Sequence, residues 1–435
     1  MVHLAAPLVL AELGWMAMGV VDTMMVGRLS AESIGAVSLG TTALNTIGIF
    51  AGGLLLGLDT FVAQSYGAGD RADCRRSLIN GVWLAIFLML PVMALIAGTI
   101  PVLGWLGIDP AVMRETRPYI AAIDWSIPPL LLYFGIRRYL QSVNIVRPVM
   151  LTLVSANLVN LAGNWIFVFG HLGMPRFGTA GSGWSTCISR VYMAASLAYV
   201  AVKHDPDLLH TTWRPDFKRM RALLVLGLPA AGQIAVETAV FAAATVLIAR
   251  LSATALASHQ IVLTTISTTF MMPLGISSAA AVRVGQAIGR GDLRGASHAG
   301  WSAIGLGAVV MSGAALALIS IPHWIARIFT PDAALIGASV VLLRICAFFQ
   351  LFDGFQVVAT GALRGTGDTH TAMICHFTGY WVIGLPVGAW LCFHYGMGAA
   401  GLWIGLSLGL ILIGAVLLGF WTRTVRRFHP VDHRN

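Results

Sequence analysis

The sequence predicts an all-α membrane protein with twelve transmembrane helices in two pseudo-symmetric six-helix lobes. Of its 435 residues, 57% are hydrophobic and only 10% are charged, whereas soluble domains carry roughly a quarter charged residues. Apolar runs of span length recur along the whole chain, and the second half repeats a pattern of the first. Together these observations place most of the chain within a lipid bilayer.

Each expected helix is an apolar run of about 20 residues, the length that crosses a bilayer. No short signal-peptide core precedes the first run, so we expect the first helix to be retained. The twelve expected spans cover residues 4–27, 35–64, 78–104, 119–140, 148–170, 180–202, 223–249, 255–282, 296–321, 336–363, 371–393 and 398–421.

The basic residues favour one orientation of these spans. With the N-terminus in the cytoplasm, nineteen Lys and Arg residues fall in inner loops or the C-terminal tail, and six fall in outer loops. Cytoplasmic loops are enriched in basic residues. We therefore expect a multi-pass protein of the inner (plasma) membrane with both termini cytoplasmic. The net charge of +9 would then face anionic lipid rather than nucleic acid.

An internal repeat joins the two halves. Residues 4–70 and 226–292 align without a gap and share 16 identities, among them "RLSA" in both halves and "QSYGAGD" against "QAIGRGD". An even number of spans per half predicts parallel repeats, as found in transporters that alternate access. The expected domains are an N-terminal lobe (1–202), a cytoplasmic linker (203–221), a C-terminal lobe (222–421) and a cytoplasmic tail (422–435).

Several repeated residues have structural interpretations. Pro7 and Pro229 are equivalent in the repeat, and each is a hinge candidate or a simple helix-entry proline. In "GAGD" and "GRGD", the glycines can end a helix, and Asp70 and Asp292 can cap the next one. A phosphate-binding loop is disfavoured because the P-loop lysine is absent.

Carboxylates inside the expected spans are the main functional signal. An ionised Asp at the centre of a membrane helix costs around 3 kcal/mol, so such acids are functional candidates. The expected spans contain Glu12, Asp22, Asp59, Asp124, Glu237 and Asp353, but only Arg190 and Arg344 as bases. We expect Asp22, Glu237 and Asp353 to be functional. For Asp59 a functional role and a structural role are equally open. For Glu12 and Asp124 we expect a structural role.

Other polar residues surround these acids. Gln350 and Gln356 flank Asp353 and supply amide dipoles. His259 and His376 are interpreted as neutral hydrogen-bonding groups rather than proton relays. The five cysteines are scattered and odd in number, which indicates neither a disulfide framework nor a metal cluster.

Six segments in order resemble the multidrug and toxic compound extrusion (MATE) family, nearest its NorM-type branch, from about residue 4 to 421. They are "MGVVDTMMVGRLS", "LDTFVAQSYGAGD", "NLVNLAGNWIFVFG", "GLPAAGQIAVETAVFAAATVLIARLSATALASHQI", "MPLGISSAAAVRVGQAIGRGD" and "VVATGALRGTGDT". The resemblance implies a monomeric antiporter without cofactors that exports organic cations or drugs in exchange for Na⁺ or H⁺.

The family pattern also implies roles for individual residues. The cation, proton and substrate site falls on Asp22, Glu237 and Asp353, with a Na⁺ ion at the last two. The motif position of Asp59 favours a supporting or structural role, and from the residues themselves we also expect supporting roles for Gln350, Gln356 and Glu12. Glu12 is a departure, because the family often has Gln at that position.

Two other functions compete with antiport. A flippase of lipid-linked precursors, from the related superfamily, requires a basic cavity for pyrophosphate. A membrane-embedded enzyme requires a nucleophile with a base, or a metal pattern such as H-E-x-x-H, and neither is present. We therefore expect a protein that is not an enzyme, and the coupling ion, Na⁺ or H⁺, stays open.

Overall fold

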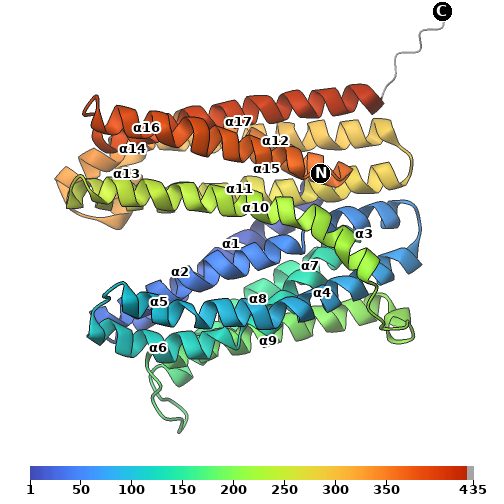
Figure 1. The fold of residues 1–435 in the computed structure, drawn as a ribbon, viewed down its shortest axis with the longest axis horizontal. Coiled ribbons are helices and arrows are strands. Elements are labelled where there is room, and N and C mark those ends of the chain that lie inside the picture. Colours follow the sequence, from blue (N-terminus) through green and yellow to red (C-terminus); the bar gives the residue numbers. More distant parts are fainter. Residues whose placement is uncertain (429–435) are drawn as a thin grey trace, which may run out of the picture. The chain divides into compact units, whose positions relative to one another are not determined.

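The computed structural model describes residues 1–428, and every regular element in that part of the chain is a helix (Figure 1). Eleven helical segments are long and apolar enough to cross a membrane. The count becomes twelve when α6 and α7, which meet at a 46° bend, are taken as one broken span. The predicted all-α fold of twelve transmembrane helices is therefore confirmed.

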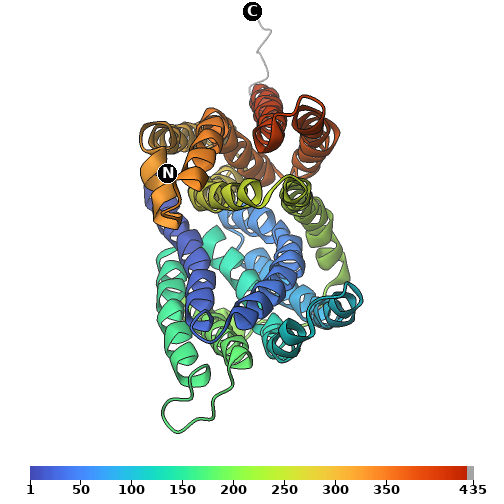
Figure 2. The same cartoon turned by 90° about the vertical axis from the view of Figure 1, so that its left-hand side faces the viewer.

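The chain folds into two compact units, and residues 10–231 form one of them. Its long helices run side by side (Figures 1 and 2). The helices that enter this unit are α1 (Val2–Val26), α2 (Ala31–Leu54), α3 (Gly57–Gly67), α4 (Arg71–Ala97), α5 (Thr99–Trp105), α6 (Pro110–Asp124), α7 (Ile127–Ser142), α8 (Arg147–Phe167), α9 (Thr179–His204), the short 3-10 helix η1 (Pro206–Leu209) and the start of α10 (Phe217–Ala249).

The other unit contains residues 1–9 together with the chain from residue 232 onward. After the end of α10, its helices are α11 (Ala253–Gly289), α12 (Leu293–Ser320), α13 (Pro322–Phe329), α14 (Ala333–Thr366), α15 (His370–His376), the π-helix η2 (Phe377–Gly384), α16 (Leu385–Phe393) and α17 (Gly398–Phe428). The first part of the expected tail, 422–428, continues α17. The rest of that tail, 429–435, lies outside the described residues.

The boundary between the units falls inside α1 and α10. Val9 packs so closely on Gly275 that a Cβ at Gly275 would lie 2.6 Å from the Val9 nitrogen. At the repeat-equivalent place, a Cβ at Gly53 would lie 2.8 Å from the Cα of Ala231. Membrane helices use such small residues for close backbone approach. These contacts fix the first turns of α1 and α10 in the units to which they belong.

Helix starts recur in both halves of the repeat. The side chains of Ser30 and Ser252 accept hydrogen bonds from backbone amides three residues later, at the starts of α2 and α11. Asp70 and Asp292 cap α4 and α12 in the same way. An N-cap of this kind satisfies an amide that has no partner within the helix. The predicted capping role of both aspartates is therefore confirmed.

Much of the surface is apolar. Leu90, Val309 and Phe348 are more than 70% exposed, and many other large hydrophobic side chains are also exposed. A soluble monomer rarely presents such extensive apolar surface. This surface fits contact with lipid tails.

Candidate functional site

Asp22 lies in a polar cluster inside the unit of residues 10–231. Its side chain is 7% exposed, on α1. One carboxylate oxygen accepts a hydrogen bond of 2.7 Å from the Asn164 side chain on α8, and the other accepts one of 3.0 Å from the Thr186 hydroxyl on α9. Asn160 joins the cluster, because its side-chain oxygen accepts from Asn164 at 3.1 Å. Three helices thus meet at this carboxylate.

The three neutral members of this cluster were not predicted from the sequence. A signal was present, since Asn160 and Asn164 lie four residues apart in an apolar helix and therefore share one face. Thr186 gave no such signal. Threonine is common in membrane helices, and only the packing of α9 against α8 brings it to Asp22.

A buried arginine lies near the same cluster. Arg190 stands one turn after Thr186 on α9 and interacts electrostatically with Asp22. Its guanidinium donates a 2.6 Å hydrogen bond to the hydroxyl of Ser126, at the break between α6 and α7. The guanidinium also lies 5.9 Å from the ring of Trp15. Arg190 therefore reduces the negative charge around Asp22 without forming a direct ion pair with it.

Glu237 and Asp353 are brought together in the other unit. Gln356 bridges them: its side-chain nitrogen donates to Asp353 at 3.0 Å and to Glu237 at 3.5 Å. Asp353 and Gln356 lie one turn apart on α14, and Glu237 lies on α10. Gln356 is fully buried, Asp353 is buried, and Glu237 is partly exposed. Two carboxylates thus share one amide.

Gln350 stands apart from this bridge. Its side-chain nitrogen donates a 2.9 Å hydrogen bond to the Thr269 hydroxyl on α11. The Gln350 side chain is fully buried. The structure therefore places Gln350 as a link between α14 and α11, and it shows Gln356 as the direct neighbour of both acids.

Glu12 and Asp59 form ion pairs. Arg137 donates to the carboxylate of Glu12, and Arg138 lies 3.4 Å from that of Asp59. The expectation that only Arg190 and Arg344 are bases within the spans is therefore wrong. Both arginines lie inside the expected span 119–140 but were counted with the inner-loop residues, and α7, which runs through Ser142, places them in a helix. Pairing of this kind satisfies the buried charge within the protein.

Asp124 ends α6 next to the break with α7, and one of its oxygens has no hydrogen-bond partner among the described residues. The two histidines do have partners. His259 shares a 2.8 Å hydrogen bond with Thr245, and His376 shares one of 2.7 Å with the carbonyl of Ala372.

Pro7 and Pro229 lie inside helices α1 and α10. The helix-entry interpretation is therefore wrong, because α1 begins at Val2 and α10 begins at Phe217. A proline inside a helix removes one backbone hydrogen bond and kinks the helix. Both residues stay hinge candidates.

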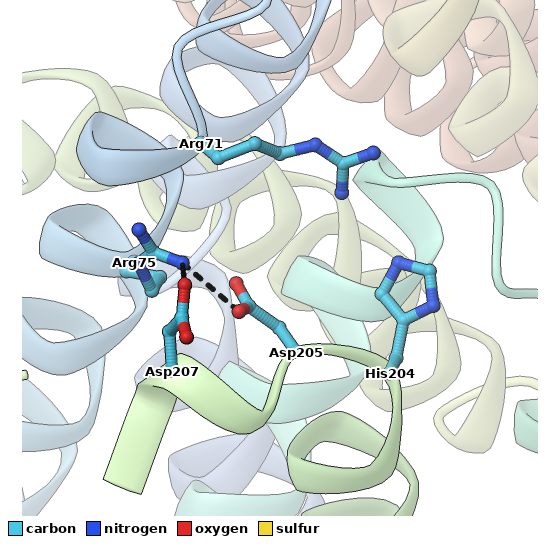
Figure 3. A pocket seen from close by; sticks show the side chains of 5 residues that line it. All are labelled: Arg71, Arg75, His204, Asp205 and Asp207. Atoms are coloured by element: carbon cyan, nitrogen blue, oxygen red, sulfur yellow. Dashed lines mark hydrogen bonds and ion pairs between the residues drawn. The ribbon is translucent and has the colours of Figure 1, made fainter. Parts of the chain in front are cut away.

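A pocket of about 340 Å³ lies at the end of α9, apart from the acids described above (Figure 3). It is lined by Arg71, Arg75, His204, Asp205 and Asp207. Arg75 donates to Asp205 at 3.0 Å and to Asp207 at 2.8 Å, so opposite charges inside the pocket largely balance (Figure 3).

The segment before α10 is tied to α4 by charge. Arg76 donates to the carboxylate of Asp216, and the backbone amides of Arg219 and Lys218 donate to the same group. These hydrogen bonds, that of Arg76 first, lower the pKa of Asp216 below its usual value. Arg219 in turn donates to Asp73. The start of α10 is therefore held by ion pairs at its first turn.

Within residues 1–428, no group of three His, Cys, Asp or Glu side chains is placed to hold a metal ion. An ion at either acid cluster would therefore need neutral oxygens as further ligands. The clusters offer amide and hydroxyl oxygens of the kind that hard cations accept.

Comparisons with known proteins agree with this architecture. The MatE family model matches residues 7–166 and again 229–390. The two matches begin at Pro7 and Pro229, the pair that the internal repeat aligns. A probable multidrug resistance protein NorM of Mesorhizobium japonicum is 36% identical over 98% of this chain and 94% of its own length. A multidrug resistance protein NorM of Burkholderia vietnamiensis is 35% identical over 98% of this chain and 92% of its own length.

Solved structures share the fold. The eukaryotic MATE transporter AtDTX14 superimposes with a TM-score of 0.87 at 20% identity, covering 98% of this chain and 97% of its own. A MOP superfamily transporter from Pyrococcus furiosus, whose binding pocket is described as having reverse polarity, gives 0.89 at 19% identity, covering 98% of this chain and 95% of its own.

Two helical units, with acids clustered inside span-length helices, define a multi-pass membrane protein of the transporter class. The matches cover most of the chain, and the curated relatives match it nearly end to end. The chain belongs to the MatE family.

Proposed function

We propose that this chain is a secondary antiporter that exports organic cations or drugs in exchange for Na⁺ or H⁺ by alternating access. One observation carries the proposal. Glu237 and Asp353 share a single neutral amide, and neither forms an ion pair with any Lys or Arg in the described part of the chain. Charged carboxylates in an apolar interior need a cation or a proton to stabilise them.

Because the two acids need a bound cation or proton, the entry of the ion is coupled to the export of the drug. A site with two acids binds a proton, a Na⁺ ion or a cationic drug, but is costly to leave empty. An ion that enters from outside therefore displaces the drug, and a drug that enters from inside displaces the ion. Asp22, which is hydrogen-bonded but not directly ion-paired, is the second place where a cation or proton would bind.

The names of the relatives support a drug substrate, because both of those described above are called multidrug resistance proteins. Their chains match this one over nearly the whole length. We extend this substrate class to the present chain as part of the proposal. We also propose that it acts as a monomer in the inner membrane with both termini cytoplasmic.

A flippase of lipid-linked precursors is the weaker candidate. It requires buried positive charge that is free to bind pyrophosphate. Arg137 and Arg138 are instead paired with Glu12 and Asp59. Arg190 donates a hydrogen bond to Ser126 and interacts electrostatically with the carboxylate of Asp22, which disfavours an anion there.

The test uses cells that overexpress the protein and are loaded with ethidium. A pulse of Na⁺ or of acid is added outside, and ethidium efflux is followed by fluorescence. We expect one of the two pulses to drive efflux in the wild type. The variants Glu237→Gln and Asp353→Asn should reduce this response to that of cells without the protein.

The matched control is Asp292→Asn. This change also converts an acid to an amide, but at the N-cap of α12, where asparagine caps a helix about as well as aspartate. The control should transport like the wild type. Pulse-driven efflux at the wild-type rate in both Glu237→Gln and Asp353→Asn would refute this site, provided that membrane levels are equal.

A further inference from the structure

The segment η2 (Phe377–Gly384) is a π-helix between α15 and α16. At its end, the amide of Leu385 donates to the carbonyl of Tyr380, five residues earlier. Each wide turn of this kind holds one more residue than an α-helical turn. π-Helical turns are rare and are found frequently at functional sites. The cation-binding mechanism proposed above gives η2 no role.

Neighbouring helices hold η2 in place. Gly379 and Gly384 both pack on α17, where a Cβ at Gly379 would lie 3.1 Å from the Gly409 oxygen and a Cβ at Gly384 would lie 3.2 Å from the Gly405 oxygen. On the other side, the indole nitrogen of Trp381 donates a 3.0 Å hydrogen bond to the carbonyl of Val236 on α10. Val236 directly precedes Glu237. The π-helix is therefore anchored beside the turn of α10 that carries this acid.

Tyr380 is the buried polar residue of η2. Its side chain is fully buried, and its hydroxyl has no hydrogen-bond partner among the residues that the structure describes. The ring packs edge-on against Phe241, one turn after Glu237, with centroids 6.0 Å apart. Tyr380 also interacts electrostatically with both Glu237 and Asp353.

A second polar atom at this place lacks a partner. The side-chain oxygen of Gln356 is buried and accepts no hydrogen bond from the described residues, although its nitrogen bridges the two acids. Leaving a polar group buried and unpaired is unfavourable. Gln356 bridges the two acids, and Tyr380 packs against the helix turn that follows Glu237, so an unpaired oxygen on each indicates that a bound species completes the site.

These oxygens favour a metal cation over a proton. A proton needs one carboxylate, whereas a hard cation takes about six oxygen ligands. Glu237 and Asp353 supply the charge, and neutral oxygens must supply further ligands.

We propose that the Tyr380 hydroxyl is a ligand of a Na⁺ ion bound by Glu237 and Asp353, positioned by the π-helix, and that it favours Na⁺ over H⁺. The role of this Na⁺ ion in transport rests on the proposed function, whereas the binding of Na⁺ by Tyr380 does not.

The test measures binding of radioactive Na⁺ to the purified full-length protein in detergent, by scintillation proximity. The variant Tyr380→Phe removes only the hydroxyl. We expect it to raise the dissociation constant for Na⁺ about tenfold, in line with the loss of one polar ligand.

The matched control is Tyr139→Phe. Tyr139 is also a buried phenol, but it lies on α7 in the other unit. This control should bind Na⁺ like the wild type. Gel filtration of each variant shows whether it is folded. If Tyr380→Phe does not fold, Trp381→Phe replaces it: this change keeps the hydroxyl but removes the anchor to Val236, and should also weaken Na⁺ binding.

The outcomes separate the inference from the proposed function. Wild-type affinity in Tyr380→Phe, or no Na⁺ binding by the wild type, overturns the inference even if efflux is normal. Weakened binding in Tyr380→Phe by a protein that exports no drug supports the inference and refutes the proposed function.

Discussion

The ion pair of Glu12 and Arg137 allows one prediction to be worked through. Glu12 is 7% exposed and Arg137 is 2% exposed, so each charge depends on the other rather than on water. Removing one partner of such a buried pair costs about 3–5 kcal/mol, because the remaining charge is left unpaired. We therefore expect Arg137→Met to destabilise the protein strongly.

The size of the effect can be expressed as a melting temperature. For a folded unit of 150–250 residues, each kcal/mol corresponds to a shift of roughly 2–4 °C. The unit that holds this pair spans residues 10–231. Arg137→Met should therefore lower the melting temperature by about 6 °C or more. The double variant Glu12→Gln/Arg137→Met leaves no unpaired charge and should recover most of this loss.

The assay heats the purified protein in detergent and measures the fraction that remains monodisperse by gel filtration. Ethidium efflux of the double variant provides a second measurement. Because the structure gives Glu12 a partner within the protein, we expect the double variant to keep pulse-driven efflux. A double variant as unstable as Arg137→Met would refute the ion-pair reasoning. Efflux as low as that of Asp353→Asn would instead assign Glu12 to ion coupling.

Two further predictions concern the other polar clusters. Asn164→Leu removes the amide that donates to Asp22, a hydrogen bond to a charged group worth about 1.5–3 kcal/mol. It should raise the ethidium concentration for half-maximal efflux about tenfold or more, whereas Asn157→Leu, whose amide donates only to backbone carbonyls, should not. The pKa of Asp216 is lowered in the folded protein, so its ion pair is fully present above about pH 4 and is lost as the pH falls further. The hydrogen-exchange protection factor at the start of α10, which is corrected for the slower intrinsic exchange at low pH, should fall below that pH in the wild type but not in Asp216→Asn, and an equal pH dependence of protection in both would contradict this.

The fold was predictable because a bilayer imposes length and apolarity on every span. Each of the twelve expected spans overlaps one helix or a run of consecutive helices. The break at 125–126 was not predicted, since a bent span has the same composition as a straight one. The π-helix around Tyr380 was missed for a similar reason, because the same residues form α- and π-helical turns.

The candidate site was predictable only in part. Asp22, Glu237 and Asp353 stand out because a carboxylate in an apolar run is costly wherever it points. Their partners depend on which helices pack together, and the sequence does not show this. Arg137 was counted with the inner-loop residues although the expected span 119–140 contains it, and this error removed the partner of Glu12 from consideration.

The exchange of the first turns of α1 and α10 has a consequence for how this protein can be divided. A gene cut within the linker would encode two polypeptides that look complete by sequence repeat. Neither would contain a whole unit, because residues 1–9 belong with the second half and the start of α10 belongs with the first. A cut in the linker therefore does not separate the two units, because each unit contains residues from both sides of the cut.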